Sequence, residues 1–293
     1  TLNEAFGSPR TGQSYTFVVA DLSNVQRTVS MTATQVTKTP VQNASTINTA
    51  SGRVGYITFH DHVLPAESQL AAAFTQLASQ GVNDLVLDLR YNGGGALYLA
   101  AQVGYMVAGS TRTANKTFER FQFSDKRTAD TNDPENNFQF FNVASGRPNT
   151  GTTANAPLPT LNLNRVYVLA SPGTCSASEA IVNGLRGVDV EVVLVGGTTC
   201  GKPYGFTAKD NCGISYFPIE FQGVNQLGFG DYANGFAPTA TCTVADDFSR
   251  ALGDSSEGML AAALNHRVTG SCGGTATGRE GPQSAGAAAF GRV

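Results

Sequence analysis

Hydrophobic positions along the chain repeatedly change period, and most changes predict a strand followed by a helix. Four near-continuous apolar runs are typical of strands buried on both faces of a sheet: 53–59, 83–90, 165–170 and 190–195. A helical pattern begins at Pro65, which suits a first helical position, and it ends at Gly81. Its expected buried face consists of Leu70, Ala73, Phe74 and Leu77.

Three further helices complete this alternation. One is expected from Ala96 to about Val107, and a second begins after the strand at 165–170 and stops at Gly187. The last is expected over about 256–267, with Asp254 and Glu257 spaced like a capping box at its start. Strands that alternate with helices predict an α/β core.

The remaining segments are weaker. Short strands are predicted at 16–20 and 27–36, and a strand with alternating faces is predicted at 214–221. The polar stretch 110–160 is interpreted as a long insertion over a pocket mouth, although an inert surface loop is the commoner fate of such a stretch. A Gly/Ala-rich tail, expected to be disordered, follows Cys272.

Composition predicts a globular chain and argues against several partners. With 293 residues and 41% hydrophobic content, the chain can bury one large core and a smaller appendage. The formal net charge is −3, and no run of five or six basic residues occurs, so no nucleic-acid or anionic-membrane partner is predicted. No apolar stretch is long enough to span a membrane. The absence of an initiator Met and of a signal-like start suggests a fragment or a processed product.

Five cysteines are most simply interpreted as two disulfide bridges and one remaining thiol. The preferred pairs are Cys200 with Cys212 and Cys242 with Cys272, which leaves Cys175 over; the alternative is five reduced thiols in a cytoplasmic protein. The spacings do not resemble a zinc site, and no metal or cofactor is predicted. Disulfides favour an exported protein.

The segment SPGTCSASE places a serine where a strand gives way to a helix. Free N–H groups at a helix N-terminus stabilise a developing anion, so Ser176 is a candidate nucleophile and the Ala177 N–H a candidate oxyanion donor. The alternative is that Thr174, Ser176 and Ser178 are only N-cap residues, which such turns favour.

The segment DLRYNGGG brings three glycines to the end of another strand. Glycine lets the backbone approach a ligand closely. The segment lacks both common phosphate-binding patterns, so nucleotide binding is not favoured. Asp88 and Arg90 are interpreted as a pair that braces the turn.

The segment TTCGKPYGF places Lys202 in a glycine-flanked loop directly after a buried strand. A lysine normally lies in solvent. To act as a base it must be desolvated, so that its pKa falls towards neutrality.

Together the three segments resemble the C-terminal-processing (tail-specific) serine peptidases, the S41 peptidases. The matching motifs are DLRYNGGG (88–95), TCSASE (174–179) and CGK (200–202), with the lysine 26 positions after the serine. The resemblance extends over about 53–270, and the three motifs are specific only in combination.

The resemblance implies a Clp-protease/crotonase-like core that works without a cofactor. It implies Ser176 as nucleophile and Lys202 as general base, a Ser-Lys dyad, with the N–H groups of Gly94 and Ala177 as oxyanion hole. Glu179 would be an auxiliary group beside the dyad.

Several positions depart from the family pattern or add to it. Phe206 stands where many members have a glutamine that orients the lysine. His60 could approach the site, although a histidine that bonds a loop at a strand end is the commoner case; Gly93 and Gly95 are expected near bound substrate. Cys175 neighbours the nucleophile and is interpreted as a buried residue or a bridge partner.

The expected domains follow from the same resemblance. They are the last strands of a PDZ-like module at 1–42, a linker at 43–52, the peptidase core at 53–270 and the tail at 271–293. The expected function is hydrolysis of polypeptides, in their C-terminal regions, in the periplasm or outside the cell, with an anchor upstream as an alternative. A peptide-binding pseudoenzyme and a crotonase-like acyl-CoA enzyme are the competing hypotheses.

Overall fold

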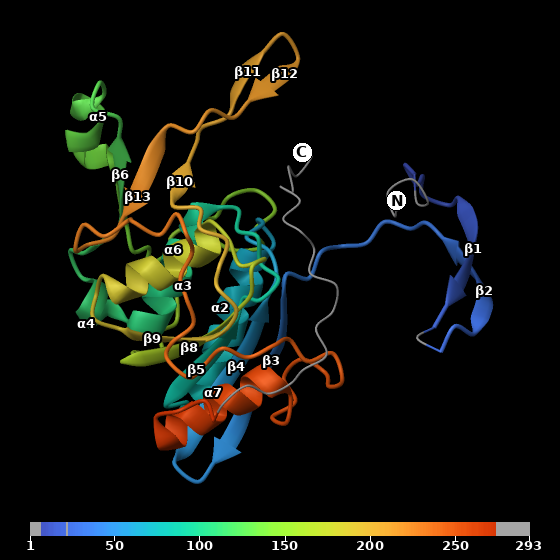
Figure 1. The fold of residues 1–293 in the computed structure, drawn as a ribbon. Helices are drawn as coiled ribbons and strands as arrows, with labels where there is room; N and C mark the ends of the chain where they lie inside the picture. Colours follow the sequence, from blue (N-terminus) through green and yellow to red (C-terminus); the bar gives the residue numbers. More distant parts are fainter. Residues whose placement is uncertain (1–6, 22, 274–293) are drawn as a thin grey trace. The chain divides into compact units, whose positions relative to one another are not determined.

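The computed structural model describes residues 7–21 and 23–273 (Figure 1). Backbone contacts divide the chain into two units, residues 1–38 and residues 39–293. In the first unit, β1 (Ser14–Ala20) pairs antiparallel with β2 (Gln26–Thr32), close to the two strands expected there. A two-stranded hairpin occurs in many folds, so the PDZ-like module stays a prediction.

The second unit contains the remaining elements. Its strands are β3 (Val41–Thr49), β4 (Gly52–Phe59), β5 (Asp84–Asp88), β6 (Thr117–Phe123), β7 (Asn137–Gln139), β8 (Arg165–Ala170), β9 (Glu191–Gly196), β10 (Tyr204–Gly205), β11 (Lys209–Asn211), β12 (Ile214–Tyr216) and β13 (Phe221–Val224). Its helices are α2 (Ala66–Ser79), α3 (Leu97–Ala108), α4 (Ser110–Thr113), α5 (Thr128–Asn132), the short 3₁₀ helix η1 (Pro134–Asn136), α6 (Ala177–Arg186) and α7 (Gly258–Thr269).

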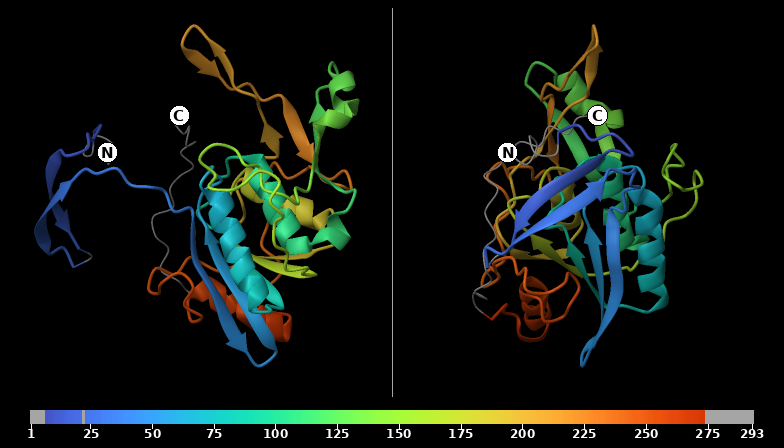
Figure 2. Two further views of the ribbon diagram at one scale, coloured as in Figure 1. Left: turned by 180° about the vertical axis from the view of Figure 1, so that it is seen from behind. Right: turned by 90° about the vertical axis from the view of Figure 1, so that its right-hand side faces the viewer.

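A five-stranded sheet in the order β3-β4-β5-β8-β9 forms the centre of this unit (Figures 1 and 2). The strand β3 is antiparallel to β4, and the other neighbours are parallel. Successive side chains point to opposite faces: Ile57 and Phe59 belong to one apolar cluster, while Val54 and Tyr56 belong to the other. Burial on both faces explains the near-continuous apolar runs and confirms the α/β prediction.

Helices cover both faces of this sheet, so a separate apolar cluster forms on each face. The larger cluster joins one face to α2, α3 and α6, and the smaller joins the other face to α7. Parallel strands place their carboxyl ends at one edge, so the loops after β5, β8 and β9 come together there. Those three loops carry the three motifs singled out above.

A second, antiparallel sheet, in the order β10-β13-β6-β7, takes two of its strands, β6 and β7, from the polar stretch interpreted as a long insertion over a pocket mouth. Phe118 of β6 is 1% exposed. Its ring lies against Gly184 of α6 and Gly104 of α3, where an added Cβ would come within 2.5 Å and 3.2 Å of the ring. These two glycines, which drew no attention in the sequence, therefore leave the space that lets the Phe118 ring pack this sheet against α3 and α6.

Two sequence predictions are corrected here. The expected linker 43–52 lies largely in β3, where polar residues are tolerated because β3 is the edge strand of the sheet. The expected strand 214–221 is two strands, β12 and β13, separated around Pro218, whose missing N–H cannot join a ladder. The predicted tail beyond residue 273 lies outside the described residues.

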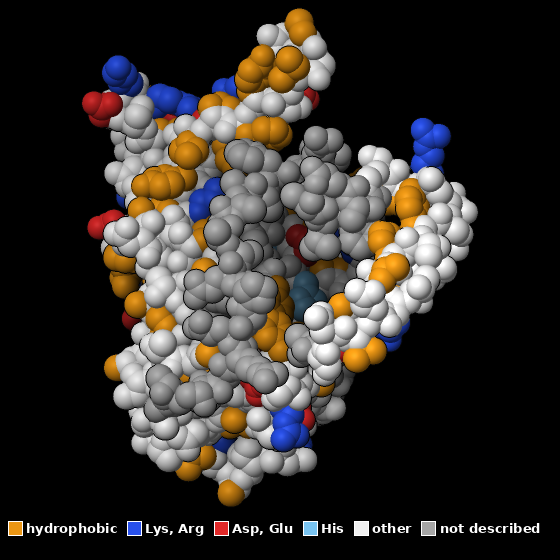
Figure 3. Space-filling model, turned by 45° about the vertical axis from the view of Figure 1, so that its right-hand side comes forward, with side chains coloured by type: hydrophobic (Ala, Val, Ile, Leu, Met, Phe, Trp, Pro, Cys, Tyr) orange, Lys and Arg blue, Asp and Glu red, His pale blue; other side chains and the backbone are white. Residues whose placement is uncertain are grey.

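The final helix begins two residues later than expected, at Gly258, because Glu257 caps it. The Glu257 carboxylate accepts hydrogen bonds from the N–H groups of Met259 and Leu260. The hairpin of β11 and β12 extends from the body of the second unit (Figure 1). Exposed apolar side chains gather on this hairpin and directly after it (Figure 3): Ile214, Tyr216, Phe217 and Ile219. In the described part of the chain, no helix is long and apolar enough to cross a bilayer.

Candidate active site

The turn between β8 and α6 holds Ser176 in an unusual backbone conformation. Its φ is 56° and its ψ is −116°, whereas an ordinary N-cap residue lies in the β region. Non-glycine residues with positive φ carry strain that the surrounding structure must offset, and such residues concentrate at functional sites. The side chain is half-buried and lines a cavity of about 700 Å³.

Glu179 fixes this turn to the loop that follows β9. Its carboxylate is fully buried and accepts hydrogen bonds from the N–H groups of Ser176 (2.9 Å), Gly201 (2.8 Å) and Lys202 (2.8 Å). The Thr199 hydroxyl also donates to it, at 2.6 Å. The glutamate expected as an auxiliary group thus holds the backbone of both loops in register.

A disulfide makes a second connection between the same two loops, and it corrects the sequence prediction. Cys175 is bonded to Cys200, with 5.2 Å between the Cα atoms, and Cys212 is the free, exposed thiol. The expected pairing of Cys200 with Cys212 and the expected free Cys175 are therefore wrong. The reason is spatial, since the turn after β8 and the loop after β9 meet at adjacent sheet positions. The predicted bridge between Cys242 and Cys272 is present.

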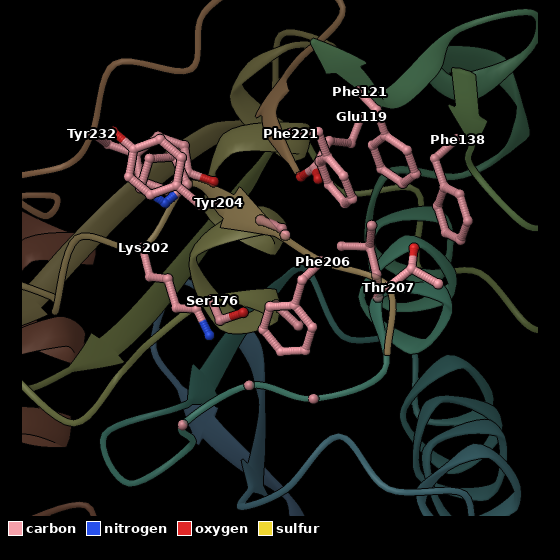
Figure 4. Close-up of a pocket in the computed structure, with 18 of the residues that line it drawn as sticks. Glu119, Phe121, Phe138, Ser176, Lys202, Tyr204, Phe206, Thr207, Phe221 and Tyr232 are labelled. Atoms are coloured by element: carbon pink, nitrogen blue, oxygen red, sulfur yellow. The ribbon is translucent and has the colours of Figure 1, made fainter. Parts of the chain in front are cut away.

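The lysine loop directs Lys202 into the same cavity. Lys202 and Ser176 both line this cavity (Figure 4), although they are 26 positions apart in the chain. The lysine is half-buried, and its Nζ lies 5.1 Å from the centre of the Phe206 ring. At the position where a glutamine was expected, an aromatic face therefore contacts the amine.

The glycine turn after β5 packs directly against the serine turn. Gly94 has a φ of 97°, and an added Cβ would lie 2.7 Å from the Cys175 carbonyl oxygen and 2.8 Å from the Ser176 Cβ. Only glycine fits this contact. Gly93, Gly94 and Gly95 all line the cavity, as does Ala177.

The two expected oxyanion donors differ in their present hydrogen bonding. The Ala177 N–H, at the first turn of α6, has no backbone or side-chain acceptor among the described residues. The Gly94 N–H donates to Asn92 Oδ1 at 3.0 Å. An oxyanion could therefore bind Ala177 directly, but it would share Gly94 with the amide oxygen of Asn92.

His62, which the sequence analysis passed over in favour of its neighbour His60, supports this turn. It is 2% exposed, and its Nδ1 lies 2.9 Å from Asn92 Oδ1, which is an acceptor, so Nδ1 carries the proton. Burial lowers the pKa of His62 to about 4. His60 instead stacks on the Tyr91 ring, with 6.5 Å between centroids, and does not line the cavity. Both histidines follow the same strand, so only the deeper burial of His62, which the sequence does not reveal, distinguishes it from His60.

The predicted pair of Asp88 and Arg90 is present and larger than expected. Arg90 is fully buried and contacts Asp88 at 3.0 Å, Glu257 at 2.9 Å and Asp246 at 2.7 Å. One guanidinium thus joins the strand before the glycine turn to the start of α7. The cluster braces the site from beneath and does not line the cavity.

The far wall of the cavity comes from the second sheet. Phe121 and Phe221 stack with 3.9 Å between ring centroids, and Phe138 lies 5.9 Å from Phe121. Glu119 also lines this wall (Figure 4). Sequence analysis missed all four residues, because the stretch that carries most of them has no clear pattern.

Among the described residues, one group has the composition of a metal site: Cys175, Glu179 and Cys200. The two sulfur atoms are bonded to each other, however, and the carboxylate already accepts the backbone hydrogen bonds described above. This group therefore lacks free thiolates to offer a metal.

The model of peptidase family S41 matches residues 53–209, which is more than half of the chain. The chain belongs to peptidase family S41. The matched region includes all three motif loops. The predicted family is therefore confirmed.

A solved structure described as an S41 protease has a similar fold. This protein, from Bacteroides fragilis NCTC 9343, is 26% identical, with a TM-score of 0.63 over 86% of this chain. A photosystem II D1 C-terminal processing protease is 22% identical, with a TM-score of 0.48 over 78% of this chain. The S41 chain described here spans 65% and 55% of those two proteins. Comparison with curated protein sequences gives no match.

Proposed function

We propose that the protein is a serine endopeptidase in which Ser176 is the nucleophile and Lys202 the general base. The observation that carries the proposal is the meeting of a strained serine and a lysine in one cavity. Their loops are held together by the Glu179 carboxylate and by a disulfide. Membership of family S41 supports peptide bonds as the target.

The proposed reaction proceeds through an acyl-enzyme. The uncharged Lys202 amine accepts the hydroxyl proton as Ser176 Oγ attacks the carbonyl carbon of the substrate. The oxyanion accepts a hydrogen bond from the Ala177 N–H and shares the Gly94 N–H with Asn92. The Lys202 ammonium then protonates the departing amine, and the same residue deprotonates the water that releases the acyl group.

We further propose that the substrates are exposed C-terminal regions of polypeptides, acted on outside the cytoplasm. The two disulfides favour an oxidising compartment, where such bonds persist. A PDZ-like module that includes residues 1–42 remains our proposal for how a free C-terminus is captured.

The dyad is tested by Ser176→Ala and Lys202→Met in the purified protein with unfolded casein as substrate. Each variant is expected to lose about 10³-fold in kcat, because nucleophile and base act as one unit. Lys116→Met, at an exposed lysine outside the cavity, is the matched control. All three should retain the wild-type melting temperature within a few degrees.

The competing outcomes are distinct. Full activity in Lys202→Met, together with loss of activity in His60→Gln, would show that His60 and not Lys202 is the general base. Inertness of the wild-type protein, combined with retained affinity for peptides, would instead favour the peptide-binding pseudoenzyme.

A further inference from the structure

A buried carboxyl group lies in the wall of the cavity that contains Ser176, and the proposed reaction does not use it. Glu119 of β6 is only 5% exposed. No hydrogen bond or ion pair joins its carboxyl group to another described residue, and burial raises the pKa of Glu119 to about 8. Buried carboxyl groups normally have a partner, because burial without one costs several kcal/mol.

The surrounding structure makes room for this group. An added Cβ at Gly223 of β13 would lie 2.2 Å from the Glu119 carboxyl carbon, so the carboxyl occupies the space that this glycine leaves open. Tyr232 lies close enough for Glu119 to raise the pKa of the phenol, after burial itself, but the two side chains share no hydrogen bond. The carboxyl group is thus accommodated sterically, but no described side chain supplies it with a hydrogen bond or a counter-charge.

The rest of this wall is aromatic. Figure 4 shows Glu119 beside Phe121 and Phe221, with Phe138 further along the wall and Tyr204 also at the cavity. Aromatic faces bind the methylene groups of a long side chain and attract a cation. The other charged or titratable groups that line the cavity are Asp61, Lys202, Tyr204 and Tyr232. Lys202 is directed to Ser176 and Phe206, so it does not supply the missing partner.

We propose that this cavity receives a lysine or arginine side chain of the substrate and that Glu119 determines this specificity. The aliphatic part of the side chain would lie along the Phe121 and Phe221 rings, and its cationic end would donate hydrogen bonds to the Glu119 carboxylate. The inference rests on the proposed peptidase function, since it names which residue beside the cleaved bond that reaction selects.

A neutral side chain fits this wall less well. Leucine or methionine would cover the rings but leave the carboxyl group buried without a partner. A cation both satisfies the carboxylate and favours its ionised form. The cost of burying Glu119 in the free protein is then recovered only when a cationic side chain binds.

The experiment uses quenched-fluorescence peptides of one sequence that carry lysine, arginine or norleucine at each of the four positions flanking the cleaved bond. Norleucine has the length of lysine without its charge. The assay is run at pH 8.5, where a carboxyl with a pKa of about 8 is largely ionised. At one of these positions, wild-type protein should cleave the lysine and arginine peptides at least roughly tenfold faster in kcat/KM than the norleucine peptide.

Glu119→Gln should remove this preference, so that the lysine, arginine and norleucine peptides are cleaved with similar kcat/KM. Glu119→Asp, which keeps the charge on a shorter side chain, should retain part of it. Glu191→Gln, at an exposed carboxylate at the start of β9, is the matched control and should behave as wild type. At pH 8.5, Glu119→Gln should also raise the melting temperature, because it removes a carboxyl group that is ionised at this pH and buried without a counter-charge.

Two failures can be told apart. Equal cleavage of the lysine and norleucine peptides by wild type, with none by Ser176→Ala, would overturn the specificity of Glu119 and leave the peptidase function standing. Absence of any cleavage would overturn the function. In that case the affinity of Ser176→Ala for the same peptides decides, since a preference for lysine that disappears on adding Glu119→Gln would still support the pocket.

Discussion

At the scale of single residues, the site depends on conformations that the chain would not adopt alone. Ser176 has a positive φ, and Gly94 must be glycine because the serine turn fills the space where its Cβ would be. Glu179 offsets part of the strain by accepting three backbone hydrogen bonds from the two loops. Ser176, the proposed nucleophile, is therefore positioned largely by one buried carboxylate.

Phe206 is the residue that distinguishes this site from the expected family pattern. Its ring centre lies 5.1 Å from the Lys202 Nζ, so the aromatic face packs against the end of the lysine side chain. Phe206→Ala is expected to lower kcat about threefold to fivefold, because the amine loses the surface that keeps it at the serine. Steady-state kinetics with a casein-derived peptide measures this effect.

The matched control is Phe217→Ala, which removes the ring that packs against Phe206 at 5.5 Å without removing the contact with Lys202. An unchanged kcat in Phe206→Ala would show that the amine is held by Ser176 and the loop backbone alone.

At the scale of elements, two loops from neighbouring parallel strands carry the residues of the proposed dyad, and the Cys175–Cys200 bridge joins these loops. The double variant Cys175→Ser/Cys200→Ser should lower the free energy of unfolding by about 3 kcal/mol, as expected for a bridge of this sequence separation. It should lower kcat roughly tenfold, since the reacting groups lose part of their fixed geometry. Thermal unfolding and peptide kinetics measure the two effects.

Cys212→Ser provides the control, because Cys212 is an exposed free thiol and its replacement should change neither quantity. The hydrogen bonds of Glu179 remain in the double variant, so some activity is expected to persist. A double variant as active as wild type would mean that Glu179 alone aligns the loops.

At the scale of the whole molecule, two buried groups make stability depend on pH in opposite directions. The pKa of His62 is lowered to about 4 by burial, from 6.5, so its contribution is fully present above pH 6.5 and is lost as the pH falls towards 4. The pKa of Glu119 is raised by burial to about 8, from 4.5, so stability is lost as the pH rises from 4.5 to 8. The two windows overlap between pH 4.5 and 6.5.

Single variants separate the two contributions. Relative to wild type, His62→Gln should lose less stability on acidification from pH 6.5 to 4, with a difference of up to about 1.4 kcal/mol per pH unit. Glu119→Gln should gain stability over wild type as the pH rises from 4.5 to 8. Chemical denaturation at half-unit pH intervals measures both differences. Parallel curves for wild type and His62→Gln below pH 6.5 would contradict the buried neutral state of His62.

The sequence alone determined the α/β core and the order of the three motif loops, because strands buried on both faces leave apolar runs and strand-end turns leave glycines and serines. Tertiary structure decided what depends on meetings between distant segments. It paired Cys175 with Cys200, placed His62 beneath the glycine turn, and folded the unpatterned stretch 110–160 into a wall that holds Glu119. Periodicity records which side of an element faces the core, but it carries no information on which buried side chains of separate elements become neighbours.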